Sequence, residues 1–209
     1  MKIYDISMEI REGMPVYKNK SEKRPKIAIT RRLKEGANES RFMLESHTGT
    51  HADAFFHMLS NGKKINEMGL NSFIGNCVVL DFTKIKSGMI TKGDFEKSSY
   101  NNKIKKNGIV LLKTREKNIM RFDHNFTYLE KTGAQFLANK KIKLVGIDNL
   151  GIERAQKNHE THKILFKKSI PVVEGLELSD IRPGKYFFIG MPLKISSDAS
   201  PVRAVLVKR

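Results

Sequence analysis

Short apolar runs separated by turn-forming residues make up most of the hydrophobic pattern of this chain. The runs at residues 77–80 and 109–112 are apolar at every position, which is typical of strands that a sheet buries on both faces. Further stretches with the alternation or composition of strands are residues 2–10, 26–33, 41–46, 144–147, 186–190 and 203–207. In the first of these we expect Ile3, Ile6 and Met8 to face inward.

Helical signals are fewer and fall between the central strands. Residues 91–98 predict a short helix, and a capping box at residues 127–130 predicts a second, with Thr127 as N-cap and Glu130 at N3. The order strand, helix, strand favours a partly parallel sheet with covering helices, to which the early hairpin adds antiparallel strands. No repeat or low-complexity linker interrupts the pattern, so we expect residues 1–209 to form one α/β domain.

Composition places the chain among soluble globular proteins. It has 209 residues, of which 39% are hydrophobic and 29% charged, enough to bury a substantial core. No apolar run approaches the length of a membrane span, and the N-terminus does not have the pattern of a signal peptide. The single cysteine, Cys77, suits a reducing compartment. These features predict a cytoplasmic protein without membrane contact.

The net charge of +17 comes from 39 Lys and Arg residues against 22 Asp and Glu residues. Such an excess could attract nucleic acid, an anionic membrane or an anionic substrate. The basic residues are scattered, however, and no basic motif interleaved with aromatic residues is present. We therefore favour a solvated basic surface, and a nucleic-acid-binding domain is an alternative that rests on net charge alone.

The residues with the clearest chemical meaning lie at 46–57, where three of the six histidines and an aspartate occur together. Imidazole and carboxylate suit Zn²⁺, or Mn²⁺ with more oxygen ligands. An ideal helix points Asp53 away from His47 and His51, and an ideal strand separates the two histidines by roughly 13 Å. The chain must therefore bend between the histidines, and Gly49 permits the bend.

Three neighbours of these residues complete the local pattern. Thr48 and Thr50 can hydrogen-bond nearby backbone and stiffen the bend. His57 follows a pair of phenylalanines and is either a further ligand or a base beside metal-bound water. The alternative, that these are ordinary loop histidines, accounts less well for the clustering.

The motif His-x-Gly-Thr-His-x-Asp-x-x-x-His resembles the signature of the metal-dependent cyclase/hydrolase family that includes bacterial kynurenine formamidase and isatin hydrolase. The similarity extends to Met-Pro-Val-Tyr at residues 14–17, His-Lys-Ile-Leu at 162–165 and Pro-Val-Val-Glu-Gly-Leu at 171–176. Residues 191–195 and 200–204 also resemble the C-terminal pattern of the family.

This resemblance implies a metal-dependent amidohydrolase with a small-molecule substrate. The implied ligands are His47 and His51 for a first Zn²⁺ or Mn²⁺ ion, His162 and Glu174 for a second, and Asp53 for both. A mononuclear site with only the ligands of the first ion is the alternative. Metal-activated water would attack an amide, formamide or lactam carbonyl, and His57 would carry the proton.

The resemblance also implies a swivelling β/β/α-type fold, a dimer or tetramer, and a substrate that packs against Tyr17. Kynurenine formamidases typically have tryptophan at the position of Tyr17, and this chain has none, so we expect a substrate other than N-formylkynurenine. His159 does not match the family pattern and is expected at the surface. The main alternative to an enzyme is a regulatory protein that kept the metal ligands and lost turnover, against which the presence of His57 argues.

Overall fold

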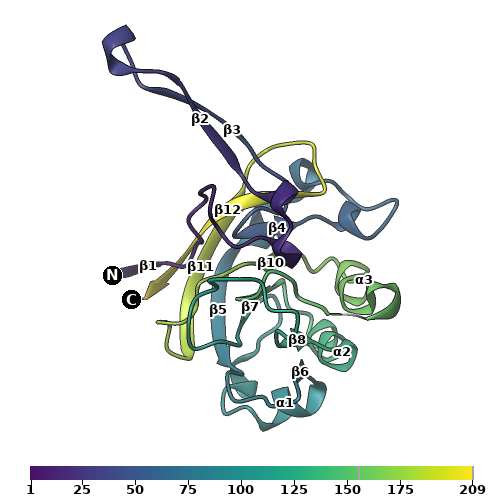
Figure 1. Cartoon of the computed structure of the whole chain (residues 1–209). Helices are drawn as coiled ribbons and strands as arrows, with labels where there is room; N and C mark the ends of the chain where they lie inside the picture. The colour runs from purple at the N-terminus through teal and green to yellow at the C-terminus, as the bar shows by residue number, and fades with distance from the viewer. Residues whose placement is uncertain (155, 209) are drawn as a thin grey trace.

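The computed structural model describes residues 1–154 and 156–208, and its centre is a closed, mixed β-barrel (Figure 1). The ring runs β12-β11-β5-β7-β9-β10-β4, and β4 pairs again with β12; β1 adds to the outer edge of β12. The strands are β1 (Lys2–Asp5), β4 (His51–Asp53), β5 (Ile74–Asp81), β7 (Ile109–Lys113), β9 (Leu144–Ile147), β10 (Val172–Glu174), β11 (Gly184–Pro192) and β12 (Ala199–Lys208). The predicted mixed sheet is therefore confirmed, and its closure into a barrel was not predicted.

Strands β5, β7, β9 and β10 are parallel to one another, and the other pairings of the sheet are antiparallel. The two apolar runs lie on β5 and β7 and are buried on both faces, as predicted. Cys77 and Val79 belong to one core, to which every strand of the ring contributes and which fills the barrel. Val78 and Leu80 belong to a second core on the outer face.

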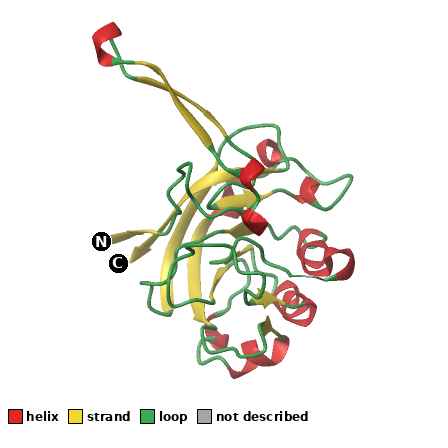
Figure 2. Ribbon diagram, in the orientation of Figure 1, coloured by secondary structure: helices red, strands yellow, loops and turns green. Residues whose placement is uncertain are grey.

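Helices α1 (Lys92–Lys97), α2 (Lys131–Asn139) and α3 (Glu160–Phe166) lie together on one side of the barrel and contribute to the outer core (Figures 1 and 2). Short 3₁₀ turns occur at Tyr17–Asn19, Ser21–Lys23, Leu33–Glu35, Phe55–His57, Ile65–Glu67, Leu70–Phe73, Asn101–Lys103 and Lys157–His159. None of the helices in residues 1–154 and 156–208 has the length and apolarity needed to cross a membrane.

The predicted start of α2 was wrong by about one turn. The helix begins at Lys131, and Glu130 is its N-cap, with a side chain that accepts a hydrogen bond from Thr132 N. Tyr128 and Leu129 form β8, which pairs in parallel with β6 (Met89–Ile90). Leu129 is fully buried in this extended conformation, so tertiary packing overrides the capping signal at Thr127.

The first strand is shorter than predicted, and one of its expected inward positions was wrong. Ile6 and Met8 are buried, but Ile3 is 58% exposed. Side chains alternate between the faces of a strand, so Ile3 cannot share the face of the even-numbered Ile6.

The predicted early hairpin consists of β2 (Lys26–Arg31) and β3 (Glu39–Met43) and projects from the body as a separate arm (Figures 1 and 2). The expectation that it adds antiparallel strands to the main sheet was wrong, because β2 and β3 form a sheet of their own and β1, β4, β11 and β12 supply the antiparallel pairings. Every residue of both strands is exposed. Ile27 pairs with Phe42, and Ile29 pairs with Ser40, so one face of the arm carries three large apolar side chains. The strand predicted at residues 41–46 lies earlier in the chain than expected: β3 stops at Met43, and a loop connects it to His47.

Candidate metal centre

The predicted bend in the histidine motif is present. Gly49 has φ +61°, in the left-handed region that favours glycine, and β4 begins two residues later at His51. Strand β4 pairs with β10 so that His51 lies opposite Glu174. His51 and Asp53 alternate with Ala52, which belongs to the barrel core, and therefore face outward, toward the side of the helices.

Contacts with distant backbone hold this bend, and the expected contacts with nearby backbone are not formed. Thr50 Oγ1 donates to Gly175 O at 2.5 Å and accepts from Met8 N at 2.8 Å. Thr48 Oγ1 is buried without a hydrogen-bond partner among the residues the structure describes. Gly175, at φ +68°, has no room for a side chain, because a Cβ there would lie 2.4 Å from Gly49 O.

Asp53 lies between the histidines of the motif and His162 of α3. Its Oδ1 is 2.9 Å from His47 Nδ1 and 3.4 Å from His51 Nε2. Its Oδ2 is 3.4 Å from His162 Nε2. The two carboxylate oxygens therefore face different histidines, an arrangement that a bridging ligand would have.

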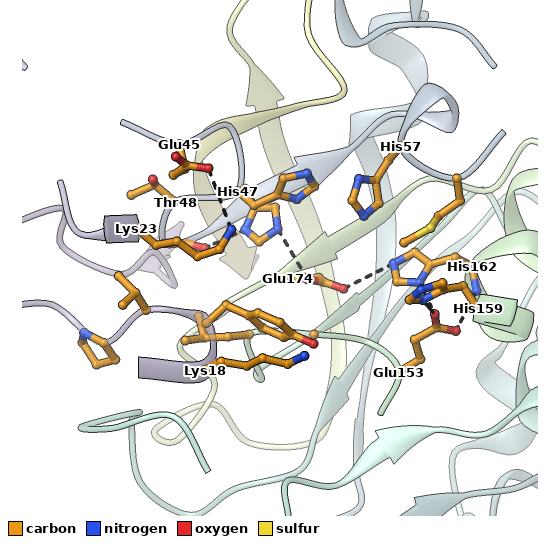
Figure 3. A pocket seen from close by; sticks show the side chains of 18 of the residues that line it. Lys18, Lys23, Glu45, His47, Thr48, His57, Glu153, His159, His162 and Glu174 are labelled. Atoms are coloured by element: carbon orange, nitrogen blue, oxygen red, sulfur yellow. Dashed lines mark hydrogen bonds and ion pairs between the residues drawn. The ribbon is translucent and has the colours of Figure 1, made fainter. Parts of the chain in front are cut away.

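Glu174 also lies between the histidines of the motif and His162 (Figure 3). Its Oε2 is 3.4 Å from His51 Nε2, and its Oε1 is 3.6 Å from His162 Nε2. Oε1 also accepts a hydrogen bond from Ile152 N at 2.6 Å. The carboxylate thus faces both histidines.

Four buried ligand atoms have no hydrogen-bond partner among the described residues: His51 Nε2, His162 Nε2 and both carboxylate oxygens of Asp53. Such groups are costly to bury unpaired, and they converge on one region. His51 Nδ1 lies 2.8 Å from Gly49 O, which fixes a proton on Nδ1 and leaves the Nε2 lone pair free. The nitrogen and oxygen donors therefore fit a divalent ion such as Zn²⁺ or Mn²⁺.

Asp198 is a residue of the site that the sequence analysis missed. Its Oδ2 is 2.9 Å from His47 Nε2 and 3.3 Å from His57 Nδ1, and its Oδ1 accepts from Ser46 Oγ at 2.9 Å. It directly precedes β12, and the pairing of β12 with β4 brings it to the motif. The family-like pattern beginning at residue 200 was the one signal close to it in the sequence.

Glu153 was missed as well. Its Oε1 is 3.1 Å from His162 Nδ1 and 2.5 Å from His159 Nδ1, while its Oε2 accepts from Thr161 N at 3.0 Å. Glu153 therefore orients the ring of His162, with Nε2 toward Asp53 and Glu174. His159 is exposed, as expected, but it also lines the cavity.

Burial and the neighbouring charged groups together determine the protonation of the residues at the site. Burial opposes protonation of His47, but Asp53 and Asp198 outweigh it and raise the pKa of His47 to about 9. Burial would also raise the pKa of Glu174, but His162 and His51 hold that pKa at about 2. Burial lowers the pKa of His57, so this ring is neutral near pH 7 and can accept a proton.

A cavity of about 440 Å³ opens above these groups (Figure 3). Its lining includes His47, His51, His57, His162 and Glu174, together with Pro15, Tyr17, Lys18, Lys23, Met58, Leu150 and Gln156. Tyr17 is 37% exposed, and its ring meets the Phe122 ring edge to face with centroids 4.9 Å apart. All the predicted site residues except Asp53 line this cavity. Asp53 is buried beside it, in contact with His47, His51 and His162.

Comparison with known proteins shows that the chain is similar to other proteins over nearly its whole length. Kynurenine formamidase from Erythrobacter litoralis is 30% identical over 214 residues, which cover 98% of this chain and 93% of that protein. Kynurenine formamidase from Bacillus anthracis is 28% identical over 207 residues, covering 98% and 97%.

Solved structures of similar fold point the same way. A protein from Bacillus stearothermophilus described as a predicted metal-dependent hydrolase is 41% identical, with a TM-score of 0.86 over 98% of this chain and 97% of that one. Isatin hydrolase A from Labrenzia aggregata has a TM-score of 0.84 over 100% and 94%, but at 21% identity it supports the fold alone. The Cyclase family model matches residues 4–154, and the chain therefore belongs to the cyclase family of metal-dependent hydrolases.

Proposed function

We propose that the protein is a metal-dependent amidohydrolase that cleaves an aryl formamide or a cyclic amide. The observation that carries this proposal is Asp53, a fully buried carboxylate whose two oxygens face different histidines, Oδ1 toward His51 and Oδ2 toward His162. The name of the relatives at 28–30% identity, kynurenine formamidase, supports amide hydrolysis as the reaction. Tyr17 lines the cavity at the position where the family resemblance implies tryptophan, which supports a substrate other than N-formylkynurenine.

We assign His47 and His51 to a first ion, His162 and Glu174 to a second, and Asp53 to both. Zn²⁺ is the preferred metal and Mn²⁺ the alternative, since both accept nitrogen and oxygen donors. When bound, the metal lowers the pKa of water toward about 7 and stabilises negative charge on the carbonyl oxygen. Glu153 keeps the ring of His162 in the orientation that this assignment needs.

His57 is the proposed proton shuttle. Its ring lines the cavity, and its centroid lies 4.3 Å from that of His47 and 5.7 Å from that of His162. Because burial keeps it neutral, it can take a proton from the attacking water and return it to the leaving nitrogen. Asp198, 3.3 Å from His57 Nδ1, would orient the ring and stabilise its protonated form.

We further propose that residues 1–209 form one domain of the swivelling β/β/α type, located in the cytoplasm. The pairing of β1 with β12 supports the single domain, because it joins segments from opposite ends of the chain. The buried, unpaired thiol of Cys77 is consistent with a reducing compartment.

A homodimer or homotetramer is the proposed assembly. The projecting hairpin supports it, since Ile27, Ile29 and Phe42 are 40%, 59% and 65% exposed on one face of an isolated two-stranded sheet. Two-stranded hairpins are marginally stable in water unless another surface covers their apolar side. A second copy of the chain would supply that surface.

The central test is metal content together with hydrolysis. We expect about two equivalents of Zn²⁺ or Mn²⁺ per wild-type chain, and far lower occupancy of both positions in Asp53→Asn, because an amide cannot replace a bridging carboxylate. The metal-loaded protein should cleave at least one member of a panel of N-formyl aryl amines and lactams, and a chelator should abolish the reaction. A content of one metal equivalent per chain would support the mononuclear site in place of the binuclear one. A folded chain that binds no metal would refute the proposed function.

Metal binding should release protons. Below pH 9 His47 is protonated in the metal-free protein, and only the neutral imidazole can bind a metal, so affinity should rise with pH and level off near 9. Calorimetric titration of Zn²⁺ at about pH 7 in two buffers of different ionisation enthalpy gives the number of protons released. No net release at that pH would contradict the role of His47 as a ligand.

His57→Ala should retain its metal and lose roughly 10²–10⁴-fold in kcat, the usual contribution of general acid–base catalysis. Steady-state kinetics and element analysis of the same preparation separate the two effects. His124→Ala is the matched control, since His124 is exposed and does not line the cavity. Loss of metal from His57→Ala would instead make His57 a ligand.

The assembly can be tested on the hairpin. Ile29→Lys combined with Phe42→Lys should reduce the mass measured by light scattering to that of a smaller species, since both changes place charge on the apolar face. Ala28→Lys, on the opposite face, adds one positive charge without altering the apolar face and should leave the mass unchanged. A monomeric wild-type protein would refute this assembly.

A further inference from the structure

We infer that the substrate is an anion, an amide that also carries a carboxylate, and that Lys18 and Lys23 select it. This inference rests on the proposed amidohydrolase function and adds the class of substrate. Both lysines line the cavity above the candidate metal centre. Figure 3 shows their side chains extending toward the space that His47, His162 and Glu174 face.

The backbone holds Lys18 in a conformation that lysine rarely adopts. Lys18 and Asn19 have φ values of 56° and 55°, in the left-handed region that is unfavourable for side chains with a Cβ. The side chain of Asn19 maintains this turn through two hydrogen bonds to the backbone of Phe122, each 3.1 Å long. The Phe122 ring in turn packs against Tyr17, so the segment that carries Lys18 is fixed at the cavity wall.

Neither lysine is neutralised by a strong ion pair. The ammonium group of Lys18 lies 5.3 Å from the centre of the Tyr17 ring and forms no ion pair with any described residue. Lys23 Nζ is 3.8 Å from Glu45 Oε2, and the two side chains are 33% and 53% exposed, so this pair contributes little. Both cations are therefore available to a ligand.

The acidic groups deeper in the cavity are already engaged. Glu153 contacts His159 and His162, and Glu174 faces His51 and His162. Besides Glu45, which lies near Lys23, the cavity thus offers the cations Lys18 and Lys23 and, with metal bound, further cations at the metal centre. The formal net charge of +17 further favours the approach of an anion.

We assign a carboxylate as the anionic group. The described lining of the cavity contains lysines and no arginine, so it offers separate point charges, which can pair with the single negative charge of a carboxylate. Lys18 and Lys23 line the same cavity of about 440 Å³ as the candidate ligands, so a small substrate with its amide at the metal centre can present a carboxylate to these lysines.

Matched pairs of substrates test this inference. The metal-loaded, full-length protein would be assayed with the three positional isomers of formamidobenzoate and with the corresponding formamidobenzamides, which have the same shape and no charge. We expect at least one acid to exceed its amide in kcat/KM by about tenfold or more, with the difference mainly in KM. High salt should reduce this ratio, because it screens charges that are not buried.

Variants of Lys18 and Lys23 test whether these two residues cause the preference for the acid substrates. Lys18→Met and Lys23→Met should each lower the ratio of acid to amide, the double variant should bring it close to one, and Lys18→Arg should preserve it. Lys20→Met is the control, because Lys20 lies between them in the sequence, does not line the cavity and pairs with Glu22 at 3.7 Å.

The possible failures are distinguishable. Hydrolysis of the neutral amides without any preference for an acid would overturn the inference and leave the amidohydrolase proposal standing. A preference that survives the double lysine variant would overturn the assignment to Lys18 and Lys23. If the metal-loaded protein cleaves no formamide or lactam at all, the proposed function fails, and the inference fails with it.

Discussion

The pairing of β4 with both β10 and β12 is the constraint on which the rest of the structure depends. This strand of three residues, His51–Asp53, closes the barrel and at the same time carries two of the candidate ligands. Its middle residue, Ala52, packs into the barrel core, so His51 and Asp53 must point outward. Its register with β10 places Glu174 beside His51, and its register with β12 brings Asp198 near His47. Closure of the barrel and formation of the site are therefore one event.

In the metal-free protein, protonated histidines occupy the electrostatic role that metal ions would take. The raised pKa of His47 means that its pairing with Asp53 and Asp198 stabilises the fold fully below about pH 6.5, the ordinary pKa of histidine. That contribution is lost as the pH rises through about 9. A bound cation would replace this stabilisation in the pH range in which His47 loses its proton. The acidic cluster is thus compensated in either state.

Much of the fold and of the candidate site could be predicted from local sequence patterns. The buried strands, the bend at Gly49 and the helix that begins after Thr91 follow from patterns of a few residues. Closure of the barrel depends on pairings between distant segments, which no local pattern encodes. The same reason explains why Asp198 and Glu153 were missed: each is an ordinary acidic residue in the sequence and acquires its role only through contacts with His47, His57 or His162.

The arrangement of the barrel also determines when the centre can form during folding. The contact between His47 and Asp198 spans 151 residues of sequence, and β12 must be in place before β4 can pair on both sides. Closing such long loops costs chain entropy before any contact compensates for it, which is typical of slow folding. A nascent chain that has emerged only as far as the histidine motif therefore holds the three proposed ligands of the first ion, but the strand pairings that fix their positions have not yet formed. The geometry of the candidate centre is complete only when the last strand has paired.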